Sequence, residues 1–332
     1  MKKIKLGIVG STGLVGSELL EILEKSNFDI GELRLFASEK SKGKLITFKN
    51  QKYQIETIDD HSFESLDYVF FCTSASVSKK YVPLALKSKC IVIDNSSYFR
   101  MNNDVPLIVP EINLEDIKNS KLISNPNCST IQSLVALKPI HDLFGIDKII
   151  YSTYQAVSGA GAKGIRDYYS SLIYQKNEFF PYLITESLIP EIDNPLDNNF
   201  TKEEVKMVEE TKKILKDNDI DINATCVRVP LLRTHAVSIY LETSKELDLN
   251  LLKSKYLENK SIILLDDLKN HIYPVGEKAL NNDYVYIGRI RKSLNNPKGL
   301  LLYVVSDNLR KGAASNMVQI LEYLVKNNRD II

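Results

Sequence analysis

Short apolar runs alternate with amphipathic segments along the first 125 residues of the chain. Residues 5–9 are almost wholly apolar, as in a buried parallel strand, and residues 17–24 place their leucines on one helical face. The same pattern predicts strands at 32–37, 68–72, 90–94 and 121–124, and a helix at 78–87. Strands that alternate with helices indicate an α/β domain with a doubly wound parallel sheet of the Rossmann type.

The pattern changes near residue 125. Helices are predicted at 129–143, from 165 onward, at 201–216 and at 313–325, with a glycine-rich bend at 158–164. Strands are predicted at 148–154, 224–229, 237–242, 284–289 and 300–305, and most of these alternate apolar and polar residues. We therefore expect a second, α+β domain with a mixed or antiparallel sheet and a boundary near Asn127.

Composition narrows the range of partners. The chain has 332 residues, which suits two domains, and its 44% of hydrophobic residues can fill a core. Lys and Arg number 43 against 42 Asp and Glu, so the net charge of +1 offers no field for nucleic acid or an anionic membrane. No apolar run approaches the roughly 20 residues that span a bilayer. We expect a cytoplasmic protein with a small-molecule substrate, without nucleic acid or membrane partners.

The four cysteines are widely spaced and include no Cys-x-x-Cys pair. This spacing predicts neither a zinc site nor a disulfide framework, and we expect no metal. Cys72, Cys90 and Cys226 lie in apolar strands, whereas Cys128 has polar neighbours and follows Asn127 at a predicted helix start. A cysteine in the first helical turn favours thiolate and suits a nucleophile. The alternative is a capped helix start with an incidental thiol.

Glycines recur at positions 7, 10, 13 and 16, where the first strand passes into the first helix. Such a loop lets the backbone approach a pyrophosphate at a helix N-terminus, and a tight turn without a ligand is the alternative. The second strand ends in Ser38 and is followed by Glu39, Ser41 and several lysines. Hydroxyls and lysines suit a 2′-phosphate, so NADP is favoured over NAD; a solvated charged loop remains the alternative.

His235 is the histidine best placed for chemistry, between two predicted strands. It follows Arg228 and Arg233 closely, and guanidinium groups indicate an anionic substrate because they pair with carboxylates or phosphates. A general base must reach the proton that it moves, and spacing alone does not tell whether His235 reaches Cys128.

The motifs resemble those of the aspartate-semialdehyde dehydrogenase family, in its shorter bacterial branch, along nearly the whole chain. They are Gly10-Ser-Thr-Gly-Leu-Val-Gly16, Ser38…Ser41-x-Gly43-Lys44, Asn95-Ser-Ser-x-x-Arg100, Asn125-Pro-Asn-Cys-Ser-Thr130, Tyr154-Gln-Ala-Val-Ser-Gly-Ala-Gly161, Glu210-Thr-Lys-Lys213, Cys226-Val-Arg-Val-Pro-Leu-Leu-Arg-x-His235 and Ser306-Asp-Asn-Leu-Arg-Lys-Gly-Ala-Ala314. The order and number of these motifs make the resemblance specific.

The resemblance implies a role for each matched position. Cys128 would be the nucleophile that forms an acyl-thioester, His235 the acid/base, and Gln155 the residue that orients the substrate. Arg228 would bind the substrate carboxylate and Glu210 its amino group, while Arg100, Asn127 and Lys213 would hold the phosphate. The implied NADP contacts are Gly10, Ser11, Thr12, Gly13, Ser38, Ser41, Thr73, Ser158, Gly159 and Asn308.

The resemblance also implies an organisation and a reaction. Residues 1–127 would bind NADP, with the C-terminal helix at 313–332 returning to them, and residues 128–312 would form the catalytic and dimerisation domain of a homodimer. The enzyme would be of the EC 1.2.1.11 type. It would convert L-4-aspartyl phosphate to L-aspartate 4-semialdehyde by reductive dephosphorylation, in lysine (diaminopimelate), threonine and methionine biosynthesis.

Three departures and several rivals accompany the resemblance. Thr234 and Ala236 replace the commoner neighbours of the histidine, the turn after Cys72 lacks glycines, which bears on Thr73, and Lys163 adds a cation after the glycine-rich bend. The nearest rival is an N-acetyl-γ-glutamyl-phosphate reductase; a glyceraldehyde-phosphate-type dehydrogenase and a non-catalytic nucleotide-sensing protein of the same fold are further alternatives. Glu210 argues against the nearest rival because a carboxylate suits a substrate amine rather than an N-acetyl group.

Overall fold

The computed structural model of the chain describes residues 3–175 and 177–327. The chain divides into two compact units, one formed within 1–126 and 313–332 and the other within 127–312. The division falls one residue before the expected boundary, and the described part of the C-terminal helix belongs to the first unit.

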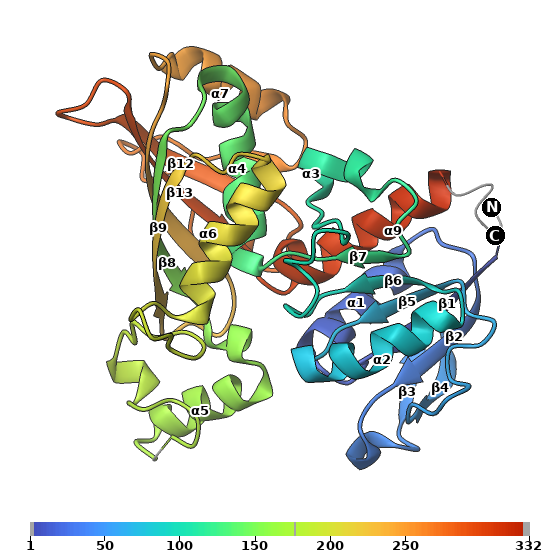
Figure 1. Cartoon of the computed structure of the whole chain (residues 1–332). Helices are drawn as coiled ribbons and strands as arrows, with labels where there is room; N and C mark the ends of the chain where they lie inside the picture. The colour runs from blue at the N-terminus through green and yellow to red at the C-terminus, as the bar shows by residue number, and fades with distance from the viewer. Residues whose placement is uncertain (1–2, 176, 328–332) are drawn as a thin grey trace. The chain divides into compact units, whose positions relative to one another are not determined.

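The first unit is built on a seven-stranded sheet with the order β3-β4-β2-β1-β5-β6-β7 (Figure 1). The strands are β1 (Ile4–Val9), β2 (Ile30–Phe36), β3 (Leu45–Phe48), β4 (Gln51–Glu56), β5 (Tyr68–Phe71), β6 (Ile91–Asp94) and β7 (Leu122–Ser124). All neighbours pair in parallel except β3 with β4. The predicted doubly wound parallel sheet is confirmed, and its strand order reverses between β1 and β5, where such sheets bind ligands.

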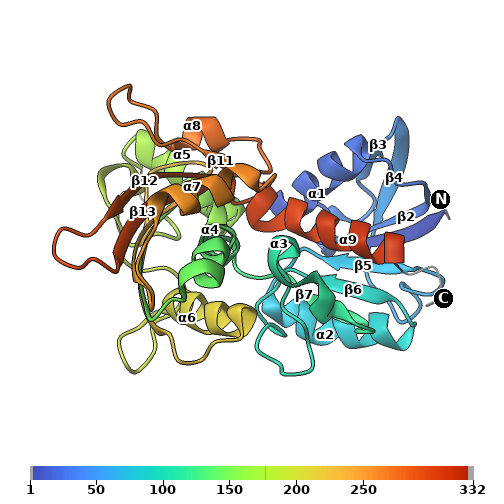
Figure 2. The same ribbon diagram turned by 90° about the horizontal axis from the view of Figure 1, so that it is seen from above.

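Helices cover both faces of this sheet (Figure 2). They are α1 (Leu14–Lys25), α2 (Ala75–Lys87), α3 (Pro110–Asn113) and α9 (Ser315–Asn327). Leu6 of β1 shares one buried cluster with Leu19 of α1 and Met317 of α9, while Val69 of β5 shares another with Val82 of α2. Burial on both faces explains why these strands read as continuous apolar runs.

The hairpin of β3 and β4 was not predicted from the sequence. Its turn residues Lys49 and Asn50 both have positive φ, 46° and 62°, as in the two-residue turns that suit hairpins. The hairpin lies at the sheet edge, and Leu45 is 58% exposed. An exposed edge pair lacks the apolar run that marked the other strands.

The second unit contains a six-stranded mixed sheet with the order β11-β12-β13-β10-β8-β9. The strands are β8 (Lys148–Gln155), β9 (Asp221–Arg228), β10 (His235–Glu242), β11 (Ile262–Leu264), β12 (Val285–Lys292) and β13 (Gly299–Ser306). The helices are α4 (Cys128–Phe144), α5 (Ala162–Leu172), α6 (Lys202–Leu215), α7 (Leu249–Glu258) and α8 (Gly276–Ala279). The predicted α+β domain with a mixed sheet is confirmed; β11, α7 and α8 were not predicted.

Helix α4 is the central helix of the second unit. It packs against β10, β12 and β13 of the sheet and against α6 and α7. Most of its side chains are buried, and its half-buried and exposed residues lie at its two ends, Cys128 at the start and Lys138, His141 and Asp142 near the end.

Candidate active site

The glycine loop lies at the carboxyl end of β1 in the first unit. Gly10 has φ +85°, and a Cβ there would come within 2.3 Å of the carbonyl oxygen of Cys72. A Cβ at Gly16 would come within 2.2 Å of the carbonyl oxygen of Gly10. Both positions therefore require glycine, one for its backbone conformation and the other for close packing of α1 under the loop.

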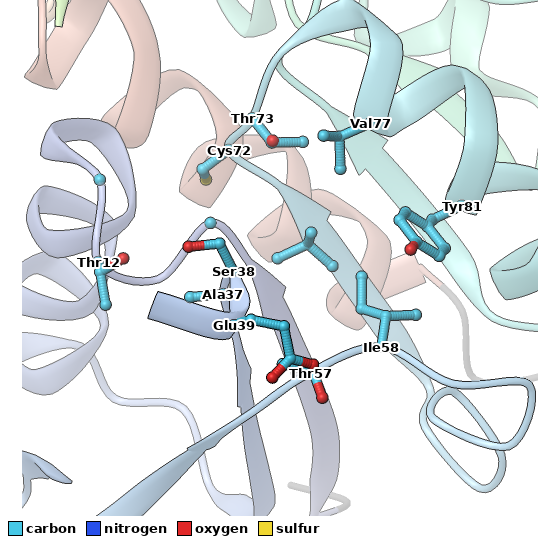
Figure 3. A pocket seen from close by; sticks show the side chains of 13 residues that line it. Thr12, Ala37, Ser38, Glu39, Thr57, Ile58, Cys72, Thr73, Val77 and Tyr81 are labelled. Carbon is cyan, nitrogen blue, oxygen red and sulfur yellow. The ribbon is translucent and has the colours of Figure 1, made fainter. Parts of the chain in front are cut away.

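A cavity of about 490 Å³ opens beside this loop (Figure 3). It is lined by Val9, Gly10, Thr12, Gly13, Ala37, Ser38, Glu39, Thr57, Ile58, Cys72, Thr73, Val77 and Tyr81. Five predicted cofactor residues of this unit thus line the cavity: Gly10, Thr12, Gly13, Ser38 and Thr73. The polar loop and an apolar wall together suit a nucleotide with a flat ring.

Two predicted cofactor residues of the first unit do not line the cavity. Ser11 is fully buried, and its hydroxyl donates to the carbonyl oxygen of Phe36 at 3.2 Å, which ties the loop to β2. Ser41 ends a short helical turn, where its backbone N–H donates to the carbonyl oxygen of Ser38. The apolar wall of Ile58, Val77 and Tyr81 was missed from the sequence; the four-residue spacing of Val77 and Tyr81 on one helix was the available signal.

Three predicted site residues of the second unit lie at one level of its sheet. His235 of β10 pairs with Gln155 of β8, and Gln155 pairs with Arg228 of β9. All three are buried, with exposed fractions of 0%, 1% and 5%. On its other side His235 pairs with Ser306, whose hydroxyl donates to Oε1 of Gln132, one turn beyond Cys128 on α4. Side chains at one register level share a face of the sheet, so the row faces α4.

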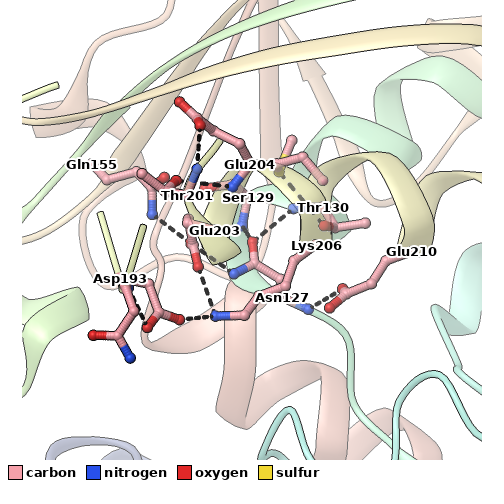
Figure 4. Close-up of polar contacts among 12 residues, drawn as sticks. Asn127, Ser129, Thr130, Gln155, Asp193, Thr201, Glu203, Glu204, Lys206 and Glu210 are labelled. Atoms are coloured by element: carbon pink, nitrogen blue, oxygen red, sulfur yellow. Dashed lines mark hydrogen bonds and ion pairs between the residues drawn. The ribbon is translucent and has the colours of Figure 1, made fainter. Parts of the chain in front are cut away.

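Cys128 is the first residue of α4, and Asn127 caps that helix. The Asn127 side-chain oxygen accepts from the backbone N–H groups of Ser129 and Thr130, at 2.9 and 3.3 Å (Figure 4). The predicted capped helix start is present, and it places the Cys128 thiol at the positive end of the α4 dipole. None of the cysteines in the described residues forms a disulfide.

Glu203 of α6 connects Asn127 to Gln155. Its Oε1 accepts from Asn127 Nδ2 at 2.8 Å and from Gln155 Nε2 at 3.0 Å, and its Oε2 accepts from Lys206 Nζ at 3.1 Å (Figure 4). Burial alone would raise the pKa of Glu203, but the charge of Lys206 and the three hydrogen bonds outweigh it and lower the pKa to about 2. The carboxyl group is therefore ionised at neutral pH.

Sequence reasoning missed Glu203 because it belongs to a charged segment at a helix start. Acidic residues are common in the first turn of solvated helices, where they complement the helix dipole. The available signal was its spacing of seven residues from Glu210, which puts both carboxylates on one face of α6.

His235 is held as a neutral imidazole. The backbone N–H of Ala156 donates to its Nδ1 at 3.0 Å, so the ring carries its proton on Nε2. Burial and then the nearby Arg228 charge lower the His235 pKa to about 3. Nε2 has no hydrogen-bond partner among residues 3–175 and 177–327. This nitrogen is the atom of the ring that can meet a substrate.

Arg228 lies beside His235 and carries a buried charge. Its Nη1 donates to the carbonyl oxygen of Ala156 at 2.7 Å, while its buried Nε has no hydrogen-bond partner within the described ranges. Burial lowers the Arg228 pKa, and the nearby Glu203 and Cys128 oppose that shift. A Cβ at Gly159 would lie 2.7 Å from Nη1 of Arg228 and 3.3 Å from Nε2 of His235. Glycine at this position leaves room beside both polar groups.

Glu210 and Lys213 complete the polar groups near the start of α4. Oε2 of Glu210 accepts from the backbone N–H of Asn127 at 2.6 Å. Burial lowers the Lys213 pKa, and the charge of Glu210 opposes this. Arg100 belongs to the first unit, where its Nη2 donates to the carbonyl oxygen of Asn95 at 2.8 Å. The second unit thus gathers two of the three residues expected to hold phosphate.

The remaining predicted cofactor residues lie together in the second unit. Asn308 Nδ2 donates to the Ser158 hydroxyl at 3.0 Å, and Asn308 Oδ1 accepts from the backbone N–H of Thr234 at 2.9 Å. Gly159 follows Ser158 directly. Thr234 has φ +75°, a strained conformation for a β-branched residue, immediately before His235. The Asn308 contact helps to hold that strained backbone in place.

Within the described part of the chain, no group of three or more His, Cys, Asp or Glu side chains is arranged to hold a metal ion. In the same residues no helix is long and apolar enough to cross a membrane.

The glycine loop on a doubly wound sheet and a capped cysteine facing a row of His, Gln and Arg define a two-domain, cysteine-containing dehydrogenase. Residues 5–120 match the semialdehyde dehydrogenase NAD binding domain, and residues 137–311 match the semialdehyde dehydrogenase dimerisation domain. The chain belongs to the aspartate-semialdehyde dehydrogenase family, a group of phosphorylating aldehyde dehydrogenases.

Relatives across nearly the whole chain support this assignment. The aspartate-semialdehyde dehydrogenase of Aquifex aeolicus is 45% identical over 333 residues, covering 97% of this chain and 98% of the relative. That of Bacillus subtilis is 42% identical, covering 98% of each. The crystal structure of aspartate semialdehyde dehydrogenase II of Vibrio cholerae, complexed with ASA, matches with a TM-score of 0.93 and 39% identity, covering 98% and 99%. The enzyme of Candida albicans with NADP matches with a TM-score of 0.78 and 25% identity, covering all of both chains.

Proposed function

We propose that the protein is an NADP-dependent aspartate-semialdehyde dehydrogenase that works through a thioester on Cys128. It would reduce L-4-aspartyl phosphate to L-aspartate 4-semialdehyde and release phosphate, on the route to lysine, threonine and methionine. The observation that carries the proposal is the row of Gln155, Arg228 and His235 on the face of the sheet that packs against α4, whose first residue is Cys128. The family assignment supplies the substrate class.

In the biosynthetic direction, Sγ of Cys128 attacks the acyl carbon of aspartyl phosphate, and the C–O bond to phosphate breaks as the thioester forms. NADPH, when bound, would supply a hydride to the thioester carbon. The oxyanion so formed would accept a hydrogen bond from Nε2–H of His235 and collapse to the aldehyde as the C–S bond breaks and Cys128 leaves as a thiolate. Nδ1 takes no part because Ala156 occupies it. The oxidative direction reverses these steps.

The substrate groups fit the buried charges near Cys128. The Arg228 guanidinium can take the α-carboxylate of the substrate, and Glu210 its ammonium group. Asn127 and Lys213, together with Arg100, would take the phosphate. The phosphate dianion and the α-carboxylate of the substrate require cations, and its ammonium group requires an acid. Arg100, Lys213 and Arg228 would be the cations, and Glu210 the acid.

The residues of the first unit suit a dinucleotide cofactor. Gly10 and Gly16 form a cradle that a Cβ would fill, and the N-terminus of α1 follows it. Thr12, Gly13, Ser38 and Thr73 would line the nucleotide, and Ser158, Gly159 and Asn308 would belong to its nicotinamide end. Two features favour NADP. Ser38 follows β2 and lines the cavity, where its hydroxyl can bind a 2′-phosphate. Lys42 lies 3.7 Å from Glu39 and neutralises the carboxylate charge that would otherwise repel that phosphate.

A homodimer would form through the second unit. The family name of residues 137–311 refers to dimerisation, and the sheet face turned away from α4 carries Ile150, which is 41% exposed, and the half-buried Tyr154, Tyr240 and Tyr303. An aromatic and apolar sheet face is typical of a permanent interface. Light scattering after gel filtration should give twice the chain mass, and Ile150→Glu should shift it to one chain.

The test of the proposed function is an assay of the purified protein with aspartate semialdehyde and phosphate, with NADP and NAD in parallel. Activity with NADP at least tenfold above that with NAD is expected. Cys128→Ala should abolish turnover while cofactor binding persists. Cys90→Ser is the control, because Cys90 is buried in the first unit and a serine keeps its contacts with the carbonyl oxygens of Phe63 and Leu66. Turnover by Cys128→Ala would refute the thioester mechanism.

A further inference from the structure

Glu203 is a buried acid for which the proposed reaction gives no role. It lies in the first turn of α6, is 6% exposed, and turns into the second unit on the same helix face as Glu210. Glu203 holds the side chain of Asn127, and Glu210 holds the backbone N–H of the same residue. Helix α6 therefore fixes the residue before Cys128 by two separate contacts.

The Glu203 carboxylate satisfies three donors at once. They are Asn127 Nδ2 at 2.8 Å, Gln155 Nε2 at 3.0 Å and Lys206 Nζ at 3.1 Å (Figure 4). These bonds also orient both amides, because each amide oxygen must then point the other way. The Asn127 oxygen caps α4, and the Gln155 oxygen accepts from the Thr153 hydroxyl at 2.9 Å. One carboxylate thus sets the orientation of the helix cap and of a substrate-facing amide.

The charge of Glu203 also acts on Arg228 and His235, the charged and titratable side chains of the row on the sheet. Its negative charge is among the influences that raise the pKa of Arg228 and of His235, against the larger effect of burial. In a buried site such a charge is felt over several ångströms. Glu203 therefore balances the buried cation beside the reacting groups without lying at the reacting groups itself.

We propose that Glu203 is a positioning residue for catalysis, which holds the Asn127 cap of the Cys128 helix and the Gln155 amide in one fixed arrangement. The proposal rests on the proposed function, since it assigns Glu203 a part in that reaction. A glutamine at this position cannot replace the carboxylate. Asn127 and Gln155 donate to one oxygen of Glu203, and Lys206 donates to the other. A glutamine that kept both amides would turn its NH₂ group toward the Lys206 ammonium, and the opposite orientation would turn the NH₂ group toward both amides. Its neutral oxygen is also a weaker acceptor than a carboxylate.

The test compares Glu203→Gln with Glu204→Gln. Glu204 is the matched control because it is 7% exposed, lies in the same turn, and accepts from the backbone N–H groups of Thr201 and Cys226 at 2.7 and 3.2 Å. Both variants should lower the melting temperature. Only Glu203→Gln should lower kcat, by about 10- to 100-fold, because small displacements of reacting groups cost up to about that much.

The Michaelis constant for aspartate semialdehyde should change less than threefold in Glu203→Gln, because Arg228 keeps its bond to the Ala156 carbonyl. Equal losses of kcat in the two variants, or a kcat within twofold of wild type in Glu203→Gln, would overturn the proposal. If Glu203→Gln does not fold, Glu203→Asp is compared with Glu204→Asp by the same criteria. The shorter aspartate keeps the charge but does not reach both amides.

A second readout does not depend on activity. In protein labelled with ¹⁵N-glutamine and ¹⁵N-asparagine, the side-chain NH₂ signals of Gln155 and Asn127 should exchange slowly with solvent. Their exchange rates should be at least tenfold higher in Glu203→Gln than in wild type, and should not change in Glu204→Gln. Wild-type protein that lacks the dehydrogenase activity would refute the proposed function, whereas unchanged exchange in Glu203→Gln would refute the positioning role of Glu203 alone.

Discussion

Acid should destabilise the protein through His235, and the substitution His235→Asn isolates this effect. The ring is fully buried, and burial followed by the Arg228 charge lowers its pKa from 6.5 to about 3. Between these two values the unfolded chain takes up a proton that the folded protein does not. The free energy of unfolding must therefore fall as the pH decreases from 6.5 toward 3.

The size of the effect follows from the two pKa values. At pH 4 the unfolded histidine lies about 2.5 pH units below its pKa, while the folded ring is still neutral, which corresponds to roughly 3 kcal/mol. Glu203 changes by only about 1 kcal/mol over the same range, because its ordinary pKa of 4.5 is close to pH 4. A loss of roughly 3 kcal/mol is a large part of the 5–15 kcal/mol that typically stabilises a folded protein.

Asparagine is a suitable replacement because its Oδ1 can accept the Ala156 N–H in place of Nδ1 and its side chain does not titrate. Unfolding of wild type and His235→Asn by urea would be followed by circular dichroism at pH 7 and pH 4, at equal protein concentration. The unfolding free energy of His235→Asn minus that of wild type should be about 3 kcal/mol larger at pH 4 than at pH 7. A difference that changes by less than about 1 kcal/mol, or a His235 ring signal that titrates near pH 6, would refute the reasoning.

Three further outcomes follow from single contacts. Gly10→Ala should destabilise the protein and weaken NADP binding, which calorimetry measures, whereas Gly43→Ala should keep NADP affinity. Both glycines have positive φ, but only at Gly10 would an added Cβ come within 2.3 Å of a carbonyl oxygen. Arg228→Lys should lower kcat/KM by about 100-fold in steady-state assays, because an ammonium group loses the two-pronged contact with a carboxylate; an unchanged value would contradict that role. Thr234→Gly should be about 1 kcal/mol more stable to urea than Thr234→Ala, because glycine relieves the strain of φ +75°.

The alternation of strands and helices was predictable because burial on both faces leaves a simple mark in the sequence. Strands such as β1 and β5 are buried on both sides and read as apolar runs. The β3–β4 hairpin has no such mark, since it lies at an edge and Leu45 points to solvent. The short strand β11 pairs in parallel with β12, and three residues are too few to show a period.

The site was predictable where its signal was local. Asn127 before Cys128 marks a capped helix start within a few residues, and the structure has that cap. The row of His235, Gln155 and Arg228 depends instead on which strands pair and in which register. Strand β8 pairs with β10 on one side and with β9 on the other, although α5 and α6 separate β8 from β9, and β10 comes only after β9. Such pairing is fixed by packing of the whole unit, and a one-residue slip would turn every side chain to the other face.

The orientation of the site depends on α6, whose role is the hardest to read from sequence. The sheet fixes Gln155 by its register, and α4 fixes Cys128 by its start, but neither element alone relates the two. Glu203 does so by accepting from both Gln155 and Asn127, and Glu210 adds a bond to the Asn127 backbone. Two carboxylates seven residues apart on a charged helix look like solvated residues until the helix is packed. Only when α6 packs and buries these two carboxylates do the predicted helix start at Cys128 and the paired strands that carry Gln155 come together in one site.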